Sequence, residues 1–183
     1  NNCESEQVSD YYKTMQNPVV GGYSQWSHVL VCPESGLSPD TIELYIRKSA
    51  LKFGKPASVV IVDYLGLLRD KQAKSRYEMV SYCSEALRVV AKRTNTILIV
   101  TVQISRPDKH SENIEVGLYD GKDSGSIECS GSLVLGAWRP DRDRMIVKVL
   151  KNSKGTSGHE IECNFDGARM KITERATLNG ELT

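Results

Sequence analysis

The sequence has few of the features that mark a disulfide-stabilised, metal-binding or membrane-embedded protein. Its five cysteines are odd in number and widely spaced, which indicates reduced thiols rather than a disulfide framework or a zinc site. The three histidines are equally scattered. The longest apolar runs, near Ser58–Leu68 and Ile97–Val102, are too short to cross a membrane. No signal segment opens the chain.

An excess of charge of one sign is also lacking. The 183 residues include 24 Lys and Arg against 23 Asp and Glu, a formal net charge of +1. This balance excludes a protein that coats nucleic acid through its overall charge, so any contact with DNA must come from a local loop. The length suits one domain with a sizeable core.

A phosphate-binding loop is the third absence. The pattern G-x-x-x-x-G-K-[S/T], whose backbone N–H groups and lysine hold nucleotide phosphates, occurs nowhere in the sequence. The chain also opens with Asn1 instead of methionine. We therefore expect an N-terminus that is either processed or truncated.

What the sequence does contain is an alternation of helical and strand-like segments. Ser38 and Pro39 predict the start of a helix that continues to Phe53. A second, long amphipathic helix is predicted at Arg76–Arg93. The β-branched run in Ser58–Asp63 predicts a strand buried on both faces. Further strands are expected at His28–Cys32, Thr96–Val102, Leu133–Trp138 and Met145–Leu150, with a hairpin at Gly158–Phe165 and Ala168–Ile172 around Asp166–Gly167. This order predicts an α/β fold with a mainly parallel sheet, flanking helices and a C-terminal β-hairpin.

Two polar residues end the predicted buried strands. Asp63 follows the first strand, at the rim where α/β sheets bind ligands, and an acid there can hold Mg²⁺ through water. A strand-end Asp that only caps the next turn is an equal alternative. Gln103 ends the next strand, where an amide can orient a water or contact a terminal phosphate. Taken singly, Gln103 fits better as a surface glutamine at a strand end.

Four motifs in order carry a family resemblance. They are Asp63-Tyr64-Leu65-Gly66-Leu67-Leu68, Val102-Gln103-Ile104-Ser105-Arg106, Asp123-Ser124-Gly125-Ser126-Ile127-Glu128, and Lys151 followed by Gly155-Thr156-Ser157-Gly158. Over residues 1–172 their order and spacing resemble the motor domain of the DnaB family of hexameric replicative helicases. The resemblance implies a RecA-like fold, with residues 1–175 as a partial motor domain that lacks its P-loop strand and helix, and residues 176–183 as a tail. Without that strand, Thr96–Val102 is expected to pair with Val59–Val62 on one side and to have an open or abnormally occupied edge on the other.

The resemblance also implies residue roles. Asp63 corresponds to the Walker B acid that positions Mg²⁺ and Gln103 to the glutamine that senses the γ-phosphate. Lys151 corresponds to a basic residue presented to the nucleotide of the neighbouring subunit, and Lys154 lies beside it. The segment Asp120–Gly125 resembles the loop that follows single-stranded DNA through the ring. The implied DNA-binding residues are Arg106, Lys122, Asp123 and Gly125.

Other positions depart from the family pattern. Ser153 stands where the family often has an arginine finger, and the ammonium of Lys154 does not replace a guanidinium fork. Ser130 and Ser132 stand where the family has acids. Glu4 is the candidate for the family's catalytic glutamate, although a first-turn helix acid explains it equally well.

The implied function is an ATP-dependent DNA helicase motor, present as a fragment whose phosphate-binding segment lies upstream of Asn1. It would use ATP and Mg²⁺, bind single-stranded DNA, and assemble into a homo-hexameric ring in the cytoplasm of a bacterial or phage-infected cell, with no membrane contact. The alternative is a P-loop-less, non-hydrolysing relative that acts as a binding or assembly module. A recombinase of the RecA type shares the fold but does not account for the paired Asp63 and Asp123 motifs.

Overall fold

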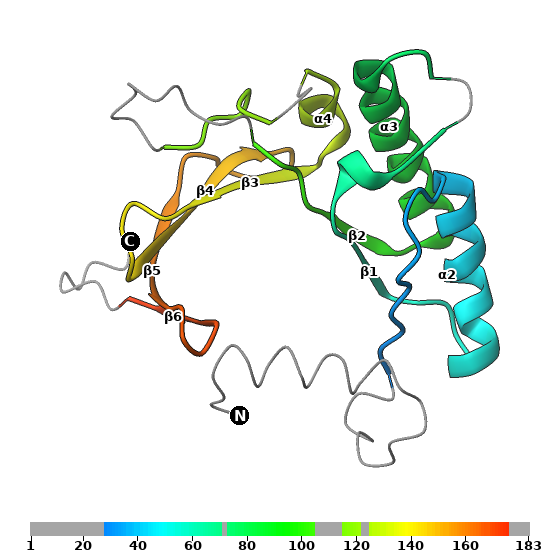
Figure 1. Ribbon diagram of the computed structural model, residues 1–183, viewed down its shortest axis with the longest axis horizontal. Helices are drawn as coiled ribbons and strands as arrows, with labels where there is room; N and C mark the ends of the chain where they lie inside the picture. The colour runs from blue at the N-terminus through cyan, green and yellow to red at the C-terminus, as the bar shows by residue number, and fades with distance from the viewer. Residues whose placement is uncertain (1–27, 71–72, 105–114, 122–124, 176–183) are drawn as a thin grey trace. The chain divides into compact units, whose positions relative to one another are not determined.

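The computed structural model describes residues 28–70, 73–104, 115–121 and 125–175. The chain divides into two compact units. The first, which we call the helical unit, is formed by residues 25–106 and 118–132; the second, the antiparallel unit, by residues 1–24, 107–117 and 133–183. Figure 1 shows their helices and strands.

Helix α2 (Pro39–Phe53) begins and ends where the sequence predicts. The Ser38 side chain accepts a hydrogen bond from the backbone N–H of Thr41 at 3.2 Å, and Pro39 occupies the first turn, where no N–H is needed. Gly54 ends the helix with φ 72°, a left-handed conformation that glycine adopts without strain.

Helix α3 (Arg76–Thr94) is the long amphipathic helix. Its N-cap is Ser75, whose side chain accepts from the Glu78 N–H at 3.1 Å, while the Glu78 carboxylate accepts from the Lys74 N–H at 2.8 Å. Asn95 ends the helix at φ 52°, the left-handed position that asparagine tolerates better than most residues. Caps at both ends therefore fix the boundaries of this helix.

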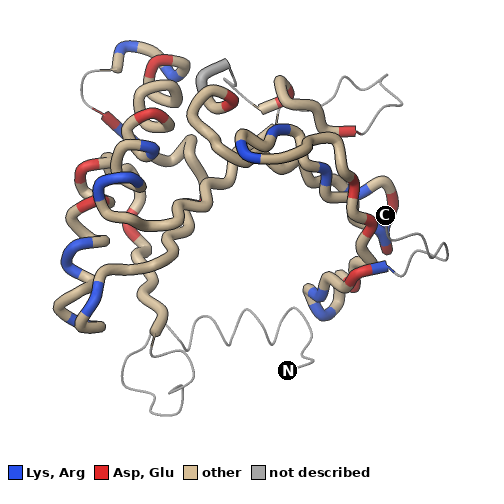
Figure 2. The backbone as a smooth tube through the Cα atoms, turned by 180° about the vertical axis from the view of Figure 1, so that it is seen from behind, with Lys and Arg blue, Asp and Glu red and all other residues tan. Residues whose placement is uncertain are grey.

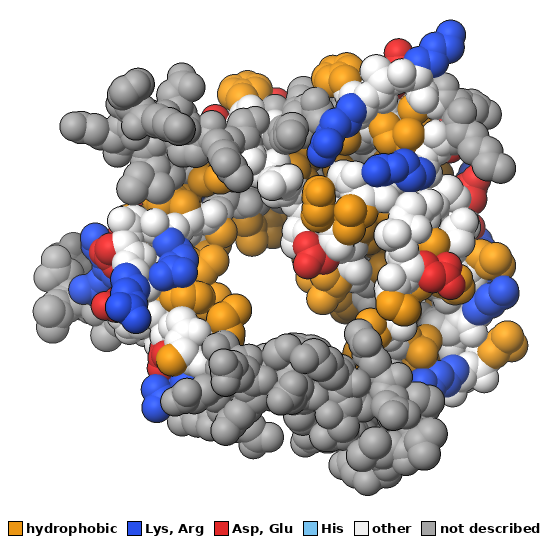
Figure 3. Space-filling view, viewed as in Figure 1, with side chains coloured by type: hydrophobic (Ala, Val, Ile, Leu, Met, Phe, Trp, Pro, Cys, Tyr) orange, Lys and Arg blue, Asp and Glu red, His pale blue; other side chains and the backbone are white. Residues whose placement is uncertain are grey.

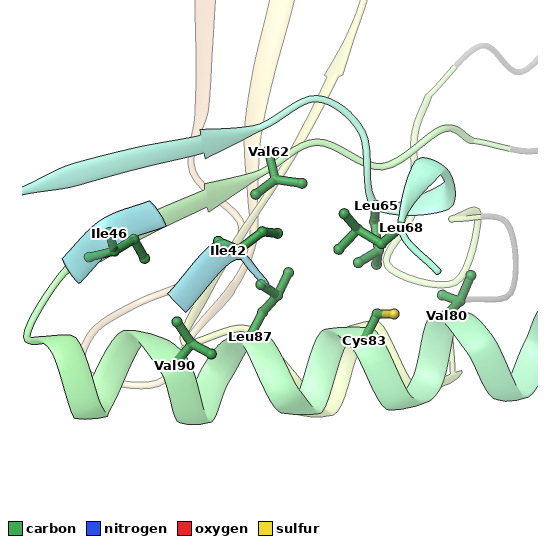
Figure 4. Packing of buried hydrophobic residues seen from close by; sticks show 9 residues of the cluster. All are labelled: Ile42, Ile46, Val62, Leu65, Leu68, Val80, Cys83, Leu87 and Val90. Carbon is green, nitrogen blue, oxygen red and sulfur yellow. The ribbon is translucent and has the colours of Figure 1, made fainter. Parts of the chain in front are cut away.

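The helical unit has one hydrophobic core. Helices α2 and α3 cover one face of a parallel pair of strands, β1 (Val59–Val62) and β2 (Ile97–Val100), and the short 3-10 helix η2 (Leu65–Leu67) follows β1. Figure 4 shows the nine buried side chains converging between α3, α2 and β1. They are Ile42, Ile46, Val62, Leu65, Leu68, Val80, Cys83, Leu87 and Val90.

The parallel pair confirms the predicted partnership of its two strands but not their burial. Val59 pairs with Ile97 and Val62 with Val100 in a continuous register. The face that carries Val60, Val62, Leu98 and Val100 packs against the core, whereas the opposite face is open. On that open face the exposed fractions are Val59 49%, Ile61 67%, Ile97 64% and Ile99 50%. Among the described residues β1 is therefore buried on one face only, and the expectation of burial on both is wrong there.

In the described part of the chain no strand pairs with the edge of β2 opposite β1, as expected from the sequence. Among the described residues β1 is the only strand paired with β2. An isolated antiparallel bridge joins Ile104 to Gly121 just beyond the strand. Neither β1 nor β2 contains a Lys, Arg, Asp or Glu residue, and Figure 2 marks where such residues lie along the backbone. An apolar strand with an unpaired edge needs a covering partner or invites pairing with another chain.

The antiparallel unit is a four-stranded sheet in the order β3-β4-β5-β6. Its strands are β3 (Leu133–Trp138), β4 (Arg144–Asn152), β5 (Glu160–Asp166) and β6 (Lys171–Glu174). The predicted hairpin is present as β5–β6, and β3 and β4 extend it to a larger sheet. Its loop is longer than the two-residue turn expected at Asp166–Gly167, because the Asp166 carboxylate accepts from the Ala168 and Arg169 N–H groups and Met170 takes φ 49°.

One predicted strand is absent. Residues His28–Cys32 form a turn and irregular backbone, and Val29, Leu30 and Val31 are exposed by 36%, 52% and 61%. A short apolar run becomes a strand only where a neighbouring strand accepts its hydrogen bonds, and no described strand pairs with it. No helix of the described residues is both long and apolar enough to span a membrane.

Candidate functional site at the strand ends

Asp63 lies immediately after β1, and Thr101 lies immediately after β2. Because the two strands are parallel and in register, their carboxyl ends meet. The Thr101 hydroxyl donates a hydrogen bond to Asp63 Oδ1 at 2.6 Å. The carboxylate is exposed to solvent, and no other described residue forms a hydrogen bond with it. The structure thus presents a solvent-accessible, oriented carboxylate at the sheet rim.

Gln103 lies two residues beyond Thr101 on the same segment. With Tyr64, Arg76 and Val102 it lines a small hollow of about 10 Å³, which has room for about one water molecule. Asp63 therefore follows β1 directly, Gln103 lies shortly beyond the end of β2, and Tyr64, the residue after Asp63, lines the same hollow as Gln103. The prediction that both polar residues occupy the same rim of the sheet agrees with this arrangement.

The oxygen ligand at this rim suits Mg²⁺ bound through water. It does not suit a metal ion that is coordinated by protein atoms alone. Mg²⁺ prefers oxygen ligands, keeps several waters and is often bound through one or two carboxylates plus substrate phosphates. Asp63 supplies one exposed carboxylate. The described residues contain no group of three or more His, Cys, Asp or Glu side chains placed to hold a metal. The residues present fit a metal ion that arrives with a nucleotide.

Lys151 and Lys154 belong to the antiparallel unit. Lys151 lies in β4 opposite Val134, and Lys154 lies in the turn after β4, where its N–H donates to Asn152 Oδ1 at 3.1 Å. Ser153 is exposed in the same turn. Lys154 is also exposed, and its role toward a neighbouring subunit stays a prediction.

Several predicted residues lie outside the described part of the chain. These are Glu4, Arg106, Lys122 and Asp123. Gly125 is described as the first residue of the six-residue helix α4 (Gly125–Ser130). The hydroxyls of Ser130 and Ser84 lie 3.2 Å apart, which joins α4 to α3. Ser130, where the resemblance leads us to expect an acid, thus contacts the Ser84 hydroxyl in this chain.

Thr101 and Arg76 are site neighbours that sequence reasoning missed. Thr101 lies 38 residues from Asp63, and only the strand register brings the two together. The sequence places Arg76 only at the start of a helix. The available signal was a hydroxyl residue at the end of a predicted strand, two positions before Gln103.

Comparison with solved structures defines the class of the fold. A structure described as an ATPase domain superimposes with a TM-score of 0.75 at 19% identity, covering 92% of this chain and 66% of that one. A DnaB-like replicative helicase, solved with regard to its interactions with primase, gives a TM-score of 0.71 at 22% identity, covering 78% of this chain and 37% of that one. The fold is RecA-like.

Sequence comparison defines the family. The profile of the "DnaB-like helicase C terminal domain" matches residues 4–174, so this chain belongs to that family. The replicative DNA helicase DnaB of Mycoplasma genitalium is 33% identical over 139 residues, which is 73% of this chain and 29% of that protein. DnaB of Helicobacter pylori strain J99 is 28% identical over 137 residues, 71% of this chain and 28% of that protein. The chain thus spans less than a third of these relatives' length.

Proposed function

We propose that residues 1–175 form part of an ATP-driven DNA helicase motor and that the rim formed by Asp63 and Gln103 serves ATP hydrolysis. The single observation that carries this proposal is the arrangement at the strand ends. A carboxylate and an amide follow two paired parallel strands, and a hydrogen bond of 2.6 Å orients the carboxylate. Membership of the DnaB-like family supports the same assignment.

Each residue has a distinct role in the proposed reaction. Asp63 would hold Mg²⁺ through water, and the ion would supply positive charge to the nucleotide phosphates. The Gln103 amide orients the attacking water or contacts the terminal phosphate. Lys151 and Lys154 approach the nucleotide of the neighbouring subunit in a homo-hexameric ring. Glu4 is the proposed general base.

The proposed DNA contact is the segment that precedes α4. Lys122 and Arg106 contact phosphates without reading sequence, while Asp123 and Gly125 shape the loop. Replacing Lys122 with alanine in the assembled ring should weaken single-strand binding for every sequence and reduce the salt slope by about one. An unchanged salt slope in the assembled ring would remove the loop from the proposal.

The central experiment compares the 183-residue chain with a polypeptide extended at its amino end through a phosphate-binding loop, which we call the loop-bearing polypeptide. The chain alone should not hydrolyse ATP, because Asp63 and Gln103 cannot position the phosphates by themselves. The loop-bearing polypeptide should hydrolyse ATP with stimulation by DNA. Asp63→Ala or Gln103→Ala should lower that rate about 100-fold or more.

A matched control is Asp166→Ala, which removes an exposed acid from the β5–β6 hairpin. It should leave ATP hydrolysis unchanged. Hydrolysis by the chain alone that Asp63→Ala abolishes would contradict the proposal, and so would a loop-bearing polypeptide whose rate survives Asp63→Ala.

A second candidate function is a non-hydrolysing binding or assembly module. It is favoured by Ser153, an exposed serine at the position where the resemblance leads us to expect an arginine finger. This candidate is a module without a P-loop, so the 183-residue chain itself would bind DNA or its partner subunits, without hydrolysis and without sensitivity to Asp63→Ala.

A further inference from the structure

The hydroxyl group of Thr101 is the one described side-chain partner of Asp63. The O–H donates to Oδ1 at 2.6 Å, the short distance expected for a hydrogen bond to an ionised acceptor. The same hydroxyl lies 3.5 Å from the Val62 carbonyl oxygen, at the limit of a hydrogen bond. Its strong contact is therefore with the carboxylate, and no described residue forms a hydrogen bond with Oδ2.

The backbone of Thr101 forms hydrogen bonds with residues on both sides of Asp63. Its N–H donates to the Val62 carbonyl at 3.0 Å, and its carbonyl accepts from the Leu65 N–H at 3.0 Å. Thr101 thus binds the residue before Asp63 and the second residue after it. These two bonds fix the point from which the hydroxyl reaches the carboxylate.

The residue type adds further order. A threonine has two heavy atoms on Cβ, which limits its χ1 torsion more than the single hydroxymethyl of serine does. Because the Thr101 backbone is hydrogen-bonded and its side chain has few rotamers, keeping the hydroxyl in place costs little conformational entropy. Asp63, by contrast, is exposed and would turn freely without this partner.

We propose that Thr101 is a positioning residue for the carboxylate that would hold Mg²⁺: its hydrogen bond to Oδ1 keeps the Asp63 side chain in one orientation. This inference rests on the proposed function of Asp63. Mg²⁺ demands near-octahedral geometry, so a carboxylate held in one orientation binds its water shell better than a rotating one. Partners of this kind, which hold a metal-binding group in place, are worth about 10–100-fold in metal affinity or activity.

The test uses two changes at Thr101 and one at the opposite end of the same strand. Thr101→Val keeps the shape and removes the donor, whereas Thr101→Ser keeps the donor. Thr96→Val is the matched control, because the Thr96 hydroxyl donates to the Ala57 carbonyl at 3.0 Å and lies away from the rim. All three are made in the loop-bearing polypeptide.

The probe is Mn²⁺, whose binding in the presence of a non-hydrolysable ATP analogue is followed by electron paramagnetic resonance. Thr101→Val should weaken Mn²⁺ binding about 10-fold and raise the Mg²⁺ concentration needed for half-maximal ATP hydrolysis in the same proportion. Thr101→Ser should restore most of the affinity. Thr96→Val should lower thermal stability without changing Mn²⁺ affinity.

The outcomes separate this inference from the proposed function. If Asp63→Ala abolishes Mn²⁺ binding and Thr101→Val does not weaken it, the inference is wrong and the role of Asp63 stands. If Asp63→Ala itself leaves Mn²⁺ binding intact, the proposed function fails as well. Equal losses from Thr101→Val and Thr96→Val, or no rescue by serine, would show a structural effect only and overturn the inference.

A second measurement uses the 183-residue chain without nucleotide. Three-bond NMR couplings of Asp63 report its χ1 torsion. A single rotamer is expected in the natural chain and in Thr101→Ser, with averaged couplings in Thr101→Val. Averaged couplings in the natural chain would overturn the inference without reference to ATP.

Discussion

The helical unit and the antiparallel unit are stabilised in different ways. Two capped helices cover one face of a two-stranded sheet in the helical unit, and nine buried apolar residues form its core. Four hydrogen-bonded strands, with one register shift between Val134 and Leu135, form the antiparallel unit, but its described buried apolar side chains are only Val116 and Cys163. Helices that pack on a sheet form a hydrophobic core with it. A single sheet with no covering layer leaves its apolar face exposed.

The strand register identifies the residues that form the apolar face of the antiparallel sheet. Leu135 lies opposite Val149, and Val147 lies between Ala137 and Ile161, so these side chains share a face. Leu135 and Ile161 are 52% and 49% exposed. The space-filling view shows many hydrophobic side chains at the surface of the described residues (Figure 3). Both units therefore carry an apolar surface that the described residues do not bury.

Truncation of a core side chain tests this difference with the largest expected effect. Leu87 in α3 is 2% exposed, so Leu87→Ala should lower the free energy of unfolding by about 2–5 kcal/mol. Leu135→Ala makes the same chemical change at an exposed site and should cost about 0.5 kcal/mol or less. Urea denaturation of the two variants makes the measurement. Similar losses for both would mean that something covers Leu135 and that the contrast between the units is false.

The Cys83 thiol tests whether the interior beneath α3 is dry. Burial raises the pKa of this thiol from 9.0 to about 11. Between those values the unfolded chain loses the proton and the folded chain keeps it, so stability falls as the pH rises. At about pH 10 the loss should be about 1.4 kcal/mol, one pKa unit of linkage. Cys83→Ala should remove this part of the decline between about pH 8 and pH 10, and equal declines in the two proteins would contradict a dry core.

The N-cap of α3 tests whether the helices of the helical unit are held by their ends as well as by the core. Ser75→Ala removes the acceptor for the Glu78 N–H and should cost about 1 kcal/mol. Ser157→Ala, an exposed serine in the antiparallel unit, is the control and should be neutral. Thermal unfolding followed by far-ultraviolet circular dichroism would check both, and a neutral Ser75→Ala would remove capping from the explanation.

The smallest effect is expected from the ion pairs of the antiparallel unit. The Lys148 ammonium contacts the carboxylates of Glu115 and Glu160, the latter at 2.8 Å. Hydrogen bonds to Glu115 and Glu160 raise the pKa of Lys148. Because surface pairs are screened by salt, Lys148→Met should lower the melting temperature less than Ser75→Ala does, and the difference from the natural chain should vanish near about 1 M salt, where the Debye length is about 3 Å. A loss that persists at high salt would assign Lys148 a packing role.

The sequence predicted the elements that local chemistry decides. Ser38, Pro39 and Gly54 fix the ends of α2, and the apolar spacing within Arg76–Arg93 predicts α3. The four family motifs indicated the fold class and the strand-end position of Asp63 and Gln103. These signals depend on residues that are close together in the sequence, so they can be recognised without knowing the fold.

The remaining features depend on contacts between distant residues. His28–Cys32 has the composition of a strand, but no described strand pairs with it. Every residue of β1 is β-branched and apolar, so the sequence of this strand does not indicate which of its two faces the helices cover. The bond between Thr101 and Asp63 spans 38 residues and follows from the register of β1 and β2. The Asp123 loop and Glu4 stay predictions, because they lie outside the described residues.

Amide hydrogen exchange of β2 tests most directly whether this strand is an inner strand of a motor sheet. The N–H groups of Ile97 and Thr101 donate toward β1, to Ser58 and Val62. Since amides alternate along a strand, those of Leu98 and Val100 point to the other edge. In the 183-residue chain they should exchange fast, and in the loop-bearing polypeptide they should become protected while Ile97 and Thr101 change little. Equally fast exchange of Leu98 and Val100 in both polypeptides would contradict the assignment of this chain to a motor sheet completed by a phosphate-binding strand.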